Sequence, residues 1–328
     1  LKVKKKALIT GITGQDGSYL AEFLIEKDYE VYGVLKRNSV AENQTARLDS
    51  VYSQLNLEYA DMTDMSSLIR VLNQVKPDEI YNLAAQSHVK ISFDQPIYTA
   101  QVVAIGVMNL LEAVRLICPK AKIYQASSSE MFGNNIDKDG FQRESTPMSP
   151  VSPYGCAKVF GYNLVRNYRN SYKLFASNGI LFNHESPRRG TNFVTNKVAK
   201  EAVKIKMGLS NELKLGNLDA ARDWGHAKDY VKCMWLMLQH EKPDDFVVST
   251  GKSHTVQDLV NYVFNSLEIP NWEQLIKQDK RFLRAEELDV LRGDCSKAKK
   301  VLSWKHEYTF ETMLDEMVEY WLEFYKKN

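Results

Sequence analysis

The sequence predicts an α/β protein built on a doubly wound parallel sheet of the Rossmann type, with a smaller, discontinuous α/β lobe beside it. A short apolar run at residues 7–10 leads directly into Gly11, Gly14 and Gly17, as expected where a buried strand turns into a helix. Apolar runs typical of buried strands then alternate with helical segments as far as residue 181. At 328 residues the chain exceeds the roughly 250–300 residues at which a single core stops growing, so we expect two lobes.

The expected elements of the first lobe follow one another in a regular order. Strands are predicted at residues 7–10, 30–35, 79–83 and 122–126, a short strand before Asp61, and helices at 18–27 and about 96–117. Ser152 and Pro153 suit the N-cap and the first position of another helix. Because ligands of such sheets bind at the carboxyl ends of the strands, we expect the site there.

The second lobe is predicted to begin after residue 183, where a polar, proline-bearing loop precedes a helix at about 193–207. The run at 246–250 predicts a strand that returns to the main sheet, and further helices are expected at 256–267 and 310–325. These boundaries assign residues 1–183 and about 220–250 to a dinucleotide-binding domain, and about 184–219 and 251–328 to the second lobe.

The composition argues against several classes of protein. The 43 basic and 41 acidic residues leave a net charge of +2, which offers no broad electrostatic surface for nucleic acid. The sequence has no run of the roughly 18 apolar residues that a membrane span needs. Four separated cysteines suggest neither a metal site nor a disulfide framework, and no signal segment is evident, so a cytoplasmic location is expected.

The glycine-rich turn predicts a dinucleotide site. Its first two glycines let the backbone turn tightly and approach a diphosphate, and the third lets the helix pack closely on the strand. The side chains and backbone assigned to this turn are those of Gly11, Thr13, Gly14, Gln15, Asp16 and Gly17.

The end of the second strand favours NADP over NAD. An NAD-selective site would place an acid there, whereas this chain has Lys36, Arg37, Asn38 and Ser39. We expect these residues to hold a 2′-phosphate, with Arg37 as the better candidate because its planar group binds phosphate through two hydrogen bonds. The alternative is a solvated basic strand end.

A run of small residues after the next strand extends the predicted cofactor site. Leu83, Ala84 and Ala85 would let the backbone pass close to the cofactor, and Ser87 follows them. His88 is interpreted as a structural or substrate-shell residue rather than a catalytic one, because a lone histidine after a strand has that role more often.

The candidate catalytic residues are Ser128, Glu130, Tyr154 and Lys158. Tyr154 and Lys158 lie four residues apart on one predicted helical face, where an ammonium would lower the phenol's pKa from about 10 and make it an acid/base. Ser128 could hydrogen-bond the same substrate hydroxyl. Glu130 could remove a carbon-bound proton beside a newly formed ketone and pass it to a leaving hydroxyl, so the predicted sum is loss of water without net redox change.

These motifs resemble those of known families. The glycine turn with Tyr154 and Lys158 resembles the extended short-chain dehydrogenases/reductases, whose Tyr-x-x-x-Lys pair acts beside a nicotinamide ring. The stretches at 11–20, 183–190, 192–195, 215–220 and 222–230 resemble, more specifically, the GDP-mannose 4,6-dehydratase family. The resemblance runs over nearly the whole chain.

The resemblance implies roles for further residues. Ser128 would polarise the sugar 4-hydroxyl and Glu130 would serve C5 and C6, with NADP as cofactor. A homotetramer is favoured, with a dimer possible, because the family's loop at 36–47 reaches a neighbouring subunit. The remaining implied cofactor contacts are Asp61, Met62, Tyr154, Lys158, His184 and Arg189. The implied GDP-sugar contacts are Ser87, Glu130, Asn183, Asn192, Phe193, Val194, Lys197, Leu215, Gly216, Arg222, Arg284 and Glu287.

The sugar itself is left open by departures from the family pattern. Ser128 replaces a usual threonine, and an insertion between residues 268 and 284 is lacking. GDP-mannose or GDP-D-glycero-D-manno-heptose is expected, with GDP-N-acetylglucosamine as an alternative. A GDP-4-keto-sugar reductase or epimerase, and a catalytically silent NADP-binding scaffold, are the competing functions.

Overall fold

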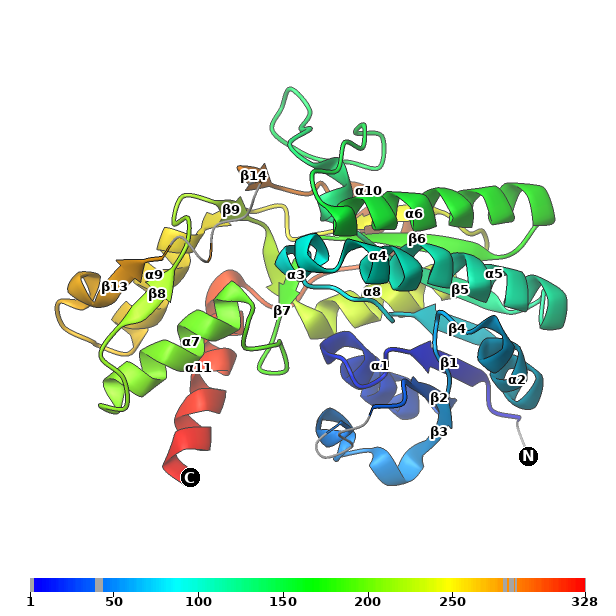
Figure 1. Ribbon diagram of the computed structural model, residues 1–328, viewed down its shortest axis with the longest axis horizontal. Coiled ribbons are helices and arrows are strands. Elements are labelled where there is room, and N and C mark those ends of the chain that lie inside the picture. Colours follow the sequence, from blue (N-terminus) through cyan, green and yellow to red (C-terminus); the bar gives the residue numbers. More distant parts are fainter. Residues whose placement is uncertain (1–2, 39–43, 280–281, 283–285, 287, 328) are drawn as a thin grey trace.

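The molecule is organised around a seven-stranded parallel sheet whose strands follow the order β11-β6-β5-β4-β1-β2-β3 (Figure 1). The computed structural model describes residues 3–38, 44–279, 282, 286 and 288–327. The strand order reverses between β1 and β4, which is where a doubly wound sheet opens a crevice for ligands. The strands are β1 (Lys6–Thr10), β2 (Glu30–Leu35), β3 (Leu55–Tyr59), β4 (Glu79–Asn82), β5 (Lys122–Ser128), β6 (Ala176–Leu181) and β11 (Asp245–Val248).

Helices cover both faces of the sheet and confirm the predicted fold class. One apolar core lies between the sheet and α1 (Gln15–Glu26), α8 (Ala227–Gln239) and α10 (Ser296–Leu302). The other lies beneath α2 (Met65–Val75), α5 (Gly106–Ile117) and α6 (Pro153–Tyr172). The sequence did not predict α2, α8, α10 or the short α3 (Val89–Asp94). The predicted N-cap of α6 is confirmed, since the Ser152 hydroxyl accepts a hydrogen bond from the Gly155 amide at 3.0 Å.

The predicted long helix at 96–117 is present in three parts. It comprises α4 (Pro96–Ala100), a π-helical turn η3 (Gln101–Ile105) and α5. In the described part of the chain, this is the one helix long and apolar enough to cross a membrane by length and composition alone, and half of it is buried. Its buried residues, such as Val107 and Leu111, belong to the apolar core between the sheet and α2, α5 and α6. Its apolar character therefore has a structural explanation.

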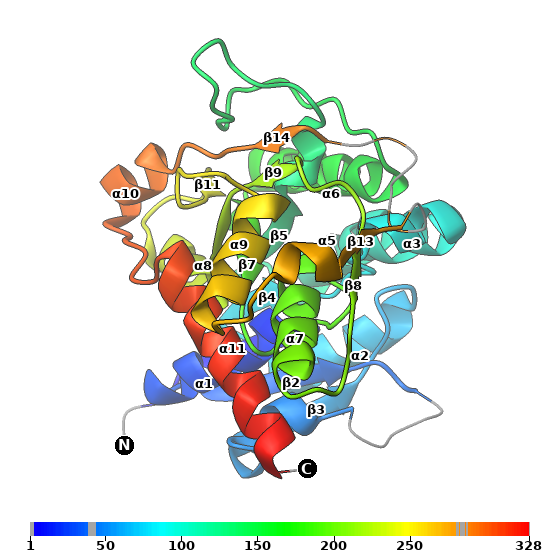
Figure 2. The ribbon, with the colours of Figure 1, turned by 90° about the vertical axis from the view of Figure 1, so that its left-hand side faces the viewer.

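The second lobe has its own apolar core. It is formed by α7 (Val194–Lys206), α9 (Val256–Ser266) and α11 (Phe310–Lys327), which lie side by side in Figure 2. The short strands β8 (Leu213–Leu215) and β13 (Ile276–Gln278) pair at its edge. The strand expected at 246–250 is confirmed as β11 of the main sheet. The division into 1–183 with 220–250 and 184–219 with 251–328 remains a prediction.

Three small pairings link the lobes. β7 (Asn183–Glu185) pairs with β10 (Trp224–His226), and β9 (Ala221–Arg222) lies between β12 (His254–Thr255) and β14 (Val290–Leu291). At the end of β5 the chain enters the short 3₁₀ helix η4 (Ser129–Phe132). Residues from these segments lie beside the carboxyl ends of the main strands.

Candidate active site

A cavity of about 910 Å³ lies at the carboxyl ends of β1, β4, β5 and β6 and extends to α7 and β8 of the second lobe. The structure brings most of the predicted cofactor, catalytic and substrate residues together around it. Those that line the cavity are Gly11, Thr13, Gly14, Gln15, Asp16, Gly17, Asp61, Met62, Leu83, Ala84, Ala85, Ser87, Ser128, Glu130, Tyr154, Lys158, Asn183, His184, Arg189, Asn192, Phe193, Val194, Lys197, Leu215, Gly216 and Arg222.

The glycine turn has the close backbone packing that a dinucleotide cradle requires. Gly11 has φ +70°, and a Cβ on it would lie 2.9 Å from the Ala84 amide nitrogen. A Cβ on Gly17 would lie only 2.3 Å from the Gly11 carbonyl oxygen. The helix begins at Gln15, three residues earlier than predicted, so its first-turn amides and Gly14 face the cavity. These features fit the diphosphate of a dinucleotide.

Ser128, Tyr154 and Lys158 occupy one wall of the cavity. Ser128 is the last residue of β5, and its hydroxyl accepts a hydrogen bond from the Glu130 amide at 3.2 Å. Tyr154 and Lys158 lie in the first two turns of α6, with Lys158 Nζ 5.6 Å from the centroid of the Tyr154 ring. Lys158 Nζ donates to the Ala126 carbonyl at 2.7 Å. The predicted spacing therefore does place both side chains on the same helical face.

The pKa of Tyr154 differs from the sequence-based prediction. Burial raises it to about 12, while hydrogen bonding with Ser128 opposes the rise. Burial also lowers the pKa of Lys158 to about 8, with the Asp16 carboxylate acting in the opposite direction. Spacing along a helix predicts proximity, but it does not predict how strongly both groups are desolvated.

Glu130 is buried within the short helix η4 and lines the same cavity. Its negative charge contributes to the raised pKa of Tyr154, which lines the same cavity. Behind it, Met131 and Phe132 are fully buried in an apolar cluster that fixes this turn. The arrangement places one carboxyl group, one phenol and one hydroxyl where a single substrate could contact all three.

A largely buried ion pair joins the glycine turn to β7. His184 Nε2 lies 2.7 Å from Asp16 Oδ2, and His184 Nδ1 lies 2.8 Å from the Phe182 carbonyl oxygen. Two acceptors require two N–H donors, so the ring is an imidazolium. Burial alone would lower the pKa of His184, but Asp16 outweighs it and the pKa is raised. Burial likewise opposes ionisation of Asp16, whose pKa His184 nevertheless lowers.

The cations after β2 are divided between the cavity and the surface. Lys36 lines the cavity, and its Nζ contacts the Tyr98 hydroxyl at 2.8 Å and Asp61 Oδ2 at 3.3 Å. Arg37 and Asn38 are exposed and do not line it. Ser39 lies outside the described residues. The sequence favoured Arg37, whereas the structure places Lys36 on the cavity wall.

The far end of the cavity is formed by the second lobe. Arg222 is buried and donates to the Leu288 carbonyl at 2.9 Å. Lys197 Nζ lies 3.3 Å from the centroid of the Phe282 ring. Phe282 lines the cavity but was not predicted, although it lies two residues before Arg284. The predicted contacts Arg284 and Glu287 lie outside the described residues.

Phe193 links the two ends of the cavity. The Arg189 guanidinium carbon lies 3.7 Å from the centroid of the Phe193 ring, and the centroid of the His88 ring lies 5.2 Å from the same point. Arg189 Nε also forms an ion pair with Glu185 Oε2 at 3.1 Å. His88 also lines the cavity, and its interpretation as a structural or substrate-shell residue stays a prediction. These contacts position the loop after β7 between the cofactor and substrate ends.

Comparison with protein families identifies the lineage of this site. The family model for GDP-mannose 4,6 dehydratase matches residues 8–317. The chain belongs to the GDP-mannose 4,6-dehydratase family. GDP-mannose 4,6 dehydratase 2 of Arabidopsis thaliana is 52% identical over 336 residues, which cover 99% of this chain and 88% of that protein. The human GDP-mannose 4,6 dehydratase is 48% identical over 343 residues, 97% of this chain and 91% of that protein.

Solved structures of other proteins share this chain's fold. A Thermotoga maritima UDP-glucose 4-epimerase, solved with UDP-glucose, is 25% identical with a TM-score of 0.85, covering 98% of this chain and 99% of that chain. DesIV, a dTDP-glucose 4,6-dehydratase of Streptomyces venezuelae solved with NAD and TYD bound, is 23% identical with a TM-score of 0.85 over 97% of both chains. RMD of Pseudomonas aeruginosa, solved with NADPH, is 21% identical with a TM-score of 0.80 over 98% of both chains.

The His184–Asp16 pair predicts a pH-dependent stability. A raised pKa in the folded state means that the charged His184 stabilises the fold fully below its unfolded value of 6.5 and loses this effect as pH rises through the folded pKa. His184→Gln should therefore lower the free energy of unfolding by about 3 kcal/mol below pH 6.5, with a smaller loss at alkaline pH. Thermal unfolding across a pH series measures this difference.

Asp16→Asn and the double variant provide the control for this prediction. Because either single change breaks the same pair, the double variant should cost little more than one of them. Full additivity, or a His184→Gln deficit that does not change with pH, would contradict the assignment.

Proposed function

We propose that this protein is an NADP-dependent GDP-mannose 4,6-dehydratase, which removes water from GDP-mannose to give the 4-keto-6-deoxy sugar. The supporting observation is that Ser128, Glu130, Tyr154 and Lys158 line one cavity in a chain that is about half identical to curated proteins of that name. A nicotinamide bound at this wall would accept hydride from C4 and later return it to C6. The glycine turn has the geometry to hold such a cofactor.

In the first step, Ser128 and Tyr154 would act on the sugar 4-hydroxyl. Ser128 orients the hydroxyl, and Tyr154 as phenolate removes its proton while C4 becomes a ketone. Lys158 stabilises the phenolate by its charge. The side chains of Tyr154 and Lys158 are buried, so bulk water does not compete for the proton.

In the second step, Glu130 would eliminate water. The ketone at C4 makes the C5 proton acidic, and the Glu130 carboxylate removes it. Protonated Glu130 then gives this proton to the 6-hydroxyl as the C6–O bond breaks, which releases water and leaves a C5–C6 double bond. The hydride taken from C4 and the proton taken from the 4-hydroxyl account for the two hydrogens that C6 and C5 finally gain, so no net oxidation occurs.

Glu130→Gln tests this proposal. An amide can neither take the C5 proton nor donate it, so formation of the product lighter by one water should fall by at least roughly 100-fold. Mass spectrometry of the nucleotide sugar after incubation with GDP-mannose measures this product. Because glutamine keeps the side chain's size, calorimetry should show nearly unchanged binding of GDP and cofactor. Wild-type turnover in the variant would refute the role of Glu130.

The same assay separates the competing functions. GDP-D-glycero-D-manno-heptose and GDP-N-acetylglucosamine are included, and the sugar with the highest kcat/KM identifies the substrate. Stoichiometric consumption of added NADPH, without water loss, would instead support a GDP-4-keto-sugar reductase. An epimerised product of unchanged mass would support an epimerase, and no product with any of these sugars would support a silent scaffold.

The choice of NADP over NAD is supported by Lys36 and Arg37. Both follow β2, where an acid would bind the ribose 2′-hydroxyl of NAD. Since a hydrogen bond to a charged group contributes about 1.5–3 kcal/mol, Lys36→Ala and Arg37→Ala should each weaken NADP binding about 10- to 100-fold and NAD binding little. Lys120→Ala is the matched control, because Lys120 is an exposed lysine just before the amino end of β5 and does not line the cavity. Equal effects on both dinucleotides would contradict the proposal.

We also infer a homo-oligomer, with a tetramer favoured over a dimer. The helical segments α4–α5 and α6 lie side by side (Figure 1). They carry exposed apolar side chains, including Ile97, Ile105 and Phe160, which are 74%, 40% and 41% exposed. Covering such side chains by a second copy would stabilise the assembly. Sedimentation velocity should show an oligomer that Phe160→Glu weakens, and a monomer at micromolar concentration would contradict it. Cytoplasmic location remains a prediction.

A further inference from the structure

A row of buried polar residues crosses five neighbouring strands of the main sheet. Thr10, Asn82, Gln125, Asn178 and Asp245 occupy matching positions on β1, β4, β5, β6 and β11. All five are almost fully buried. Because side chains of paired residues point to the same side of a parallel sheet, these five form one continuous line, which we call the polar row.

The polar row lies on the face of the sheet that α6 covers. Two residues earlier on four of the strands stand Leu8, Ile80, Ile123 and Ala176, which belong to the apolar core that includes Val165 of α6. Since strand residues two apart share a face, the polar row faces α6 as well. Tyr154 and Lys158 are therefore carried by a helix that packs over this row.

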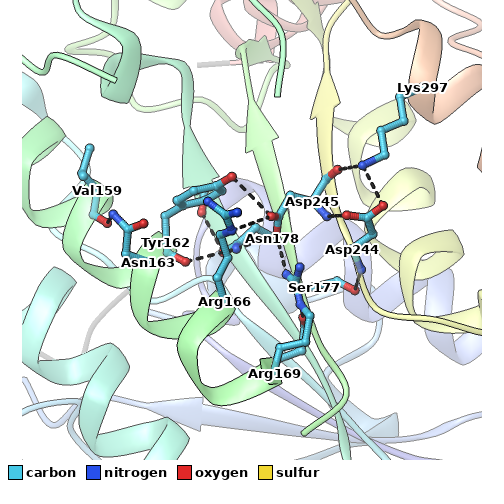
Figure 3. Close-up of polar contacts among 12 residues, drawn as sticks. Val159, Tyr162, Asn163, Arg166, Arg169, Ser177, Asn178, Asp244, Asp245 and Lys297 are labelled. Carbon is cyan, nitrogen blue, oxygen red and sulfur yellow. Dashed lines mark hydrogen bonds and ion pairs between the residues drawn. The ribbon is translucent and has the colours of Figure 1, made fainter. Parts of the chain in front are cut away.

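One end of the polar row holds the later turns of α6 (Figure 3). Asp245 forms an ion pair with Arg169 and lies 3.5 Å from Arg166 Nε. It also accepts hydrogen bonds from the Tyr162 hydroxyl at 3.3 Å and the Asn178 amide at 2.8 Å. These contacts fix the helix against β6 and β11, well away from the cavity.

The other end of the polar row reaches Lys158 through a chain of hydrogen bonds. The Thr10 hydroxyl donates to Asn82, and Asn82 Nδ2 donates to Gln125 Oε1 at 2.7 Å. Gln125 Nε2 then donates to the Ala126 carbonyl at 2.9 Å. Lys158 Nζ donates to the same carbonyl at 2.7 Å. One carbonyl oxygen, with two lone pairs, thus receives both donors.

The direction of every bond in this chain is determined at its start. The Thr10 oxygen accepts hydrogen bonds from the backbone amides of Leu83 and Ala84, each at 3.2 Å. Its single proton is then left for the Asn82 oxygen, so Asn82 must present its amino group to Gln125. Gln125 must in turn present its own amino group to Ala126. The backbone beside the glycine turn therefore orients the carbonyl that holds Lys158.

We propose that Gln125 is a positioning residue for Lys158: its amide fixes the direction of the Ala126 carbonyl, which in turn holds the ammonium beside Tyr154. Gln125 itself does not line the cavity, so it acts through this carbonyl. The inference rests on the proposed function for its kinetic consequence, but the position and titration of Lys158 can be measured without turnover.

The charges around Lys158 define what a change at residue 125 would do. The charge of Asp16, from α1, favours a higher pKa of Lys158. The pKa of the neighbouring Tyr154 is raised by the charges of Asp16 and of Glu130 from η4, and lowered by that of Arg189 from the loop after β7. His184 from β7 pairs with Asp16. A carboxylate at position 125 would add a negative charge from β5, the element opposite α6, and would favour the ammonium form.

Two substitutions at Gln125 test the proposal by opposite shifts. In Gln125→Glu, the added carboxylate should raise the pKa of Lys158 above about 8. In Gln125→Met, which removes the amide without adding charge, the carbonyl is less well oriented and the pKa should fall. The readout is NMR titration of isotope-labelled lysines in the ligand-free protein, with the Lys158 signal identified by its loss in Lys158→Met.

The kinetic readout separates positioning from substrate binding. Both Gln125 variants should lower kcat about tenfold, the effect of one displaced hydrogen bond, with KM for the GDP-sugar nearly unchanged. If the wild type makes no dehydrated product, the proposed function fails, while the titration still reports on Gln125. If Gln125→Glu does not fold, Gln125→Met, which buries no charge, carries the test.

Gln142 provides the matched control. It is also fully buried, donates to the Asn135 carbonyl at 2.8 Å and accepts from the Arg292 amide at 3.2 Å, but it does not line the cavity. Gln142→Glu and Gln142→Met should lower thermal stability without changing the pKa of Lys158 or kcat. If the Gln125 variants behave in the same way, with the Lys158 titration unmoved, Gln125 serves the fold alone and the proposal is overturned.

Discussion

The burial of the Lys158 ammonium is the constraint on which the site depends. A cation out of water is stable only with acceptors and opposite charge around it, and here these are the Ala126 carbonyl and the nearby Asp16 carboxylate. Asp16 is itself largely removed from water, with 19% of its side chain exposed, and it pairs with the imidazolium of His184. One buried charge thus links α6, α1 and β7, so the segments that form the cavity stabilise one another.

The order of strands in the sheet explains why these groups meet. The chain passes from β1 outward to β3 and returns to β4, so the carboxyl ends of β1, β4 and β5 lie side by side. At this edge Gly11 contacts Ala84, and Thr10 receives the amides of Leu83 and Ala84. The same backbone segment therefore closes the glycine turn and starts the hydrogen-bond chain to Lys158.

Structural features that short motifs encode could be predicted from the sequence. Features that depend on the register of the strands could not. The Ser152 cap, the glycine turn and the parallel sheet follow from short motifs and their alternation. The sequence favoured Arg37 by its chemistry, whereas Lys36 lines the cavity. Neighbouring residues after a strand point to different sides, and only the folded register shows which one faces the cavity. Gln125 gave no signal, since a polar residue in an apolar strand acquires meaning only when its partners Asn82 and Ala126 are known.

The chemistry of Tyr154 is a property of the assembled site rather than of its spacing from Lys158. With a pKa of about 12 for Tyr154 and about 8 for Lys158, rising pH removes the proton of the ammonium first. A phenolate near neutral pH therefore needs positive charge in the cavity beyond Lys158. Arg189 acts in this direction, whereas Glu130 and Asp16 oppose it. The balance among Arg189, Glu130 and Asp16, and not the spacing from Lys158 alone, therefore sets the acidity of Tyr154.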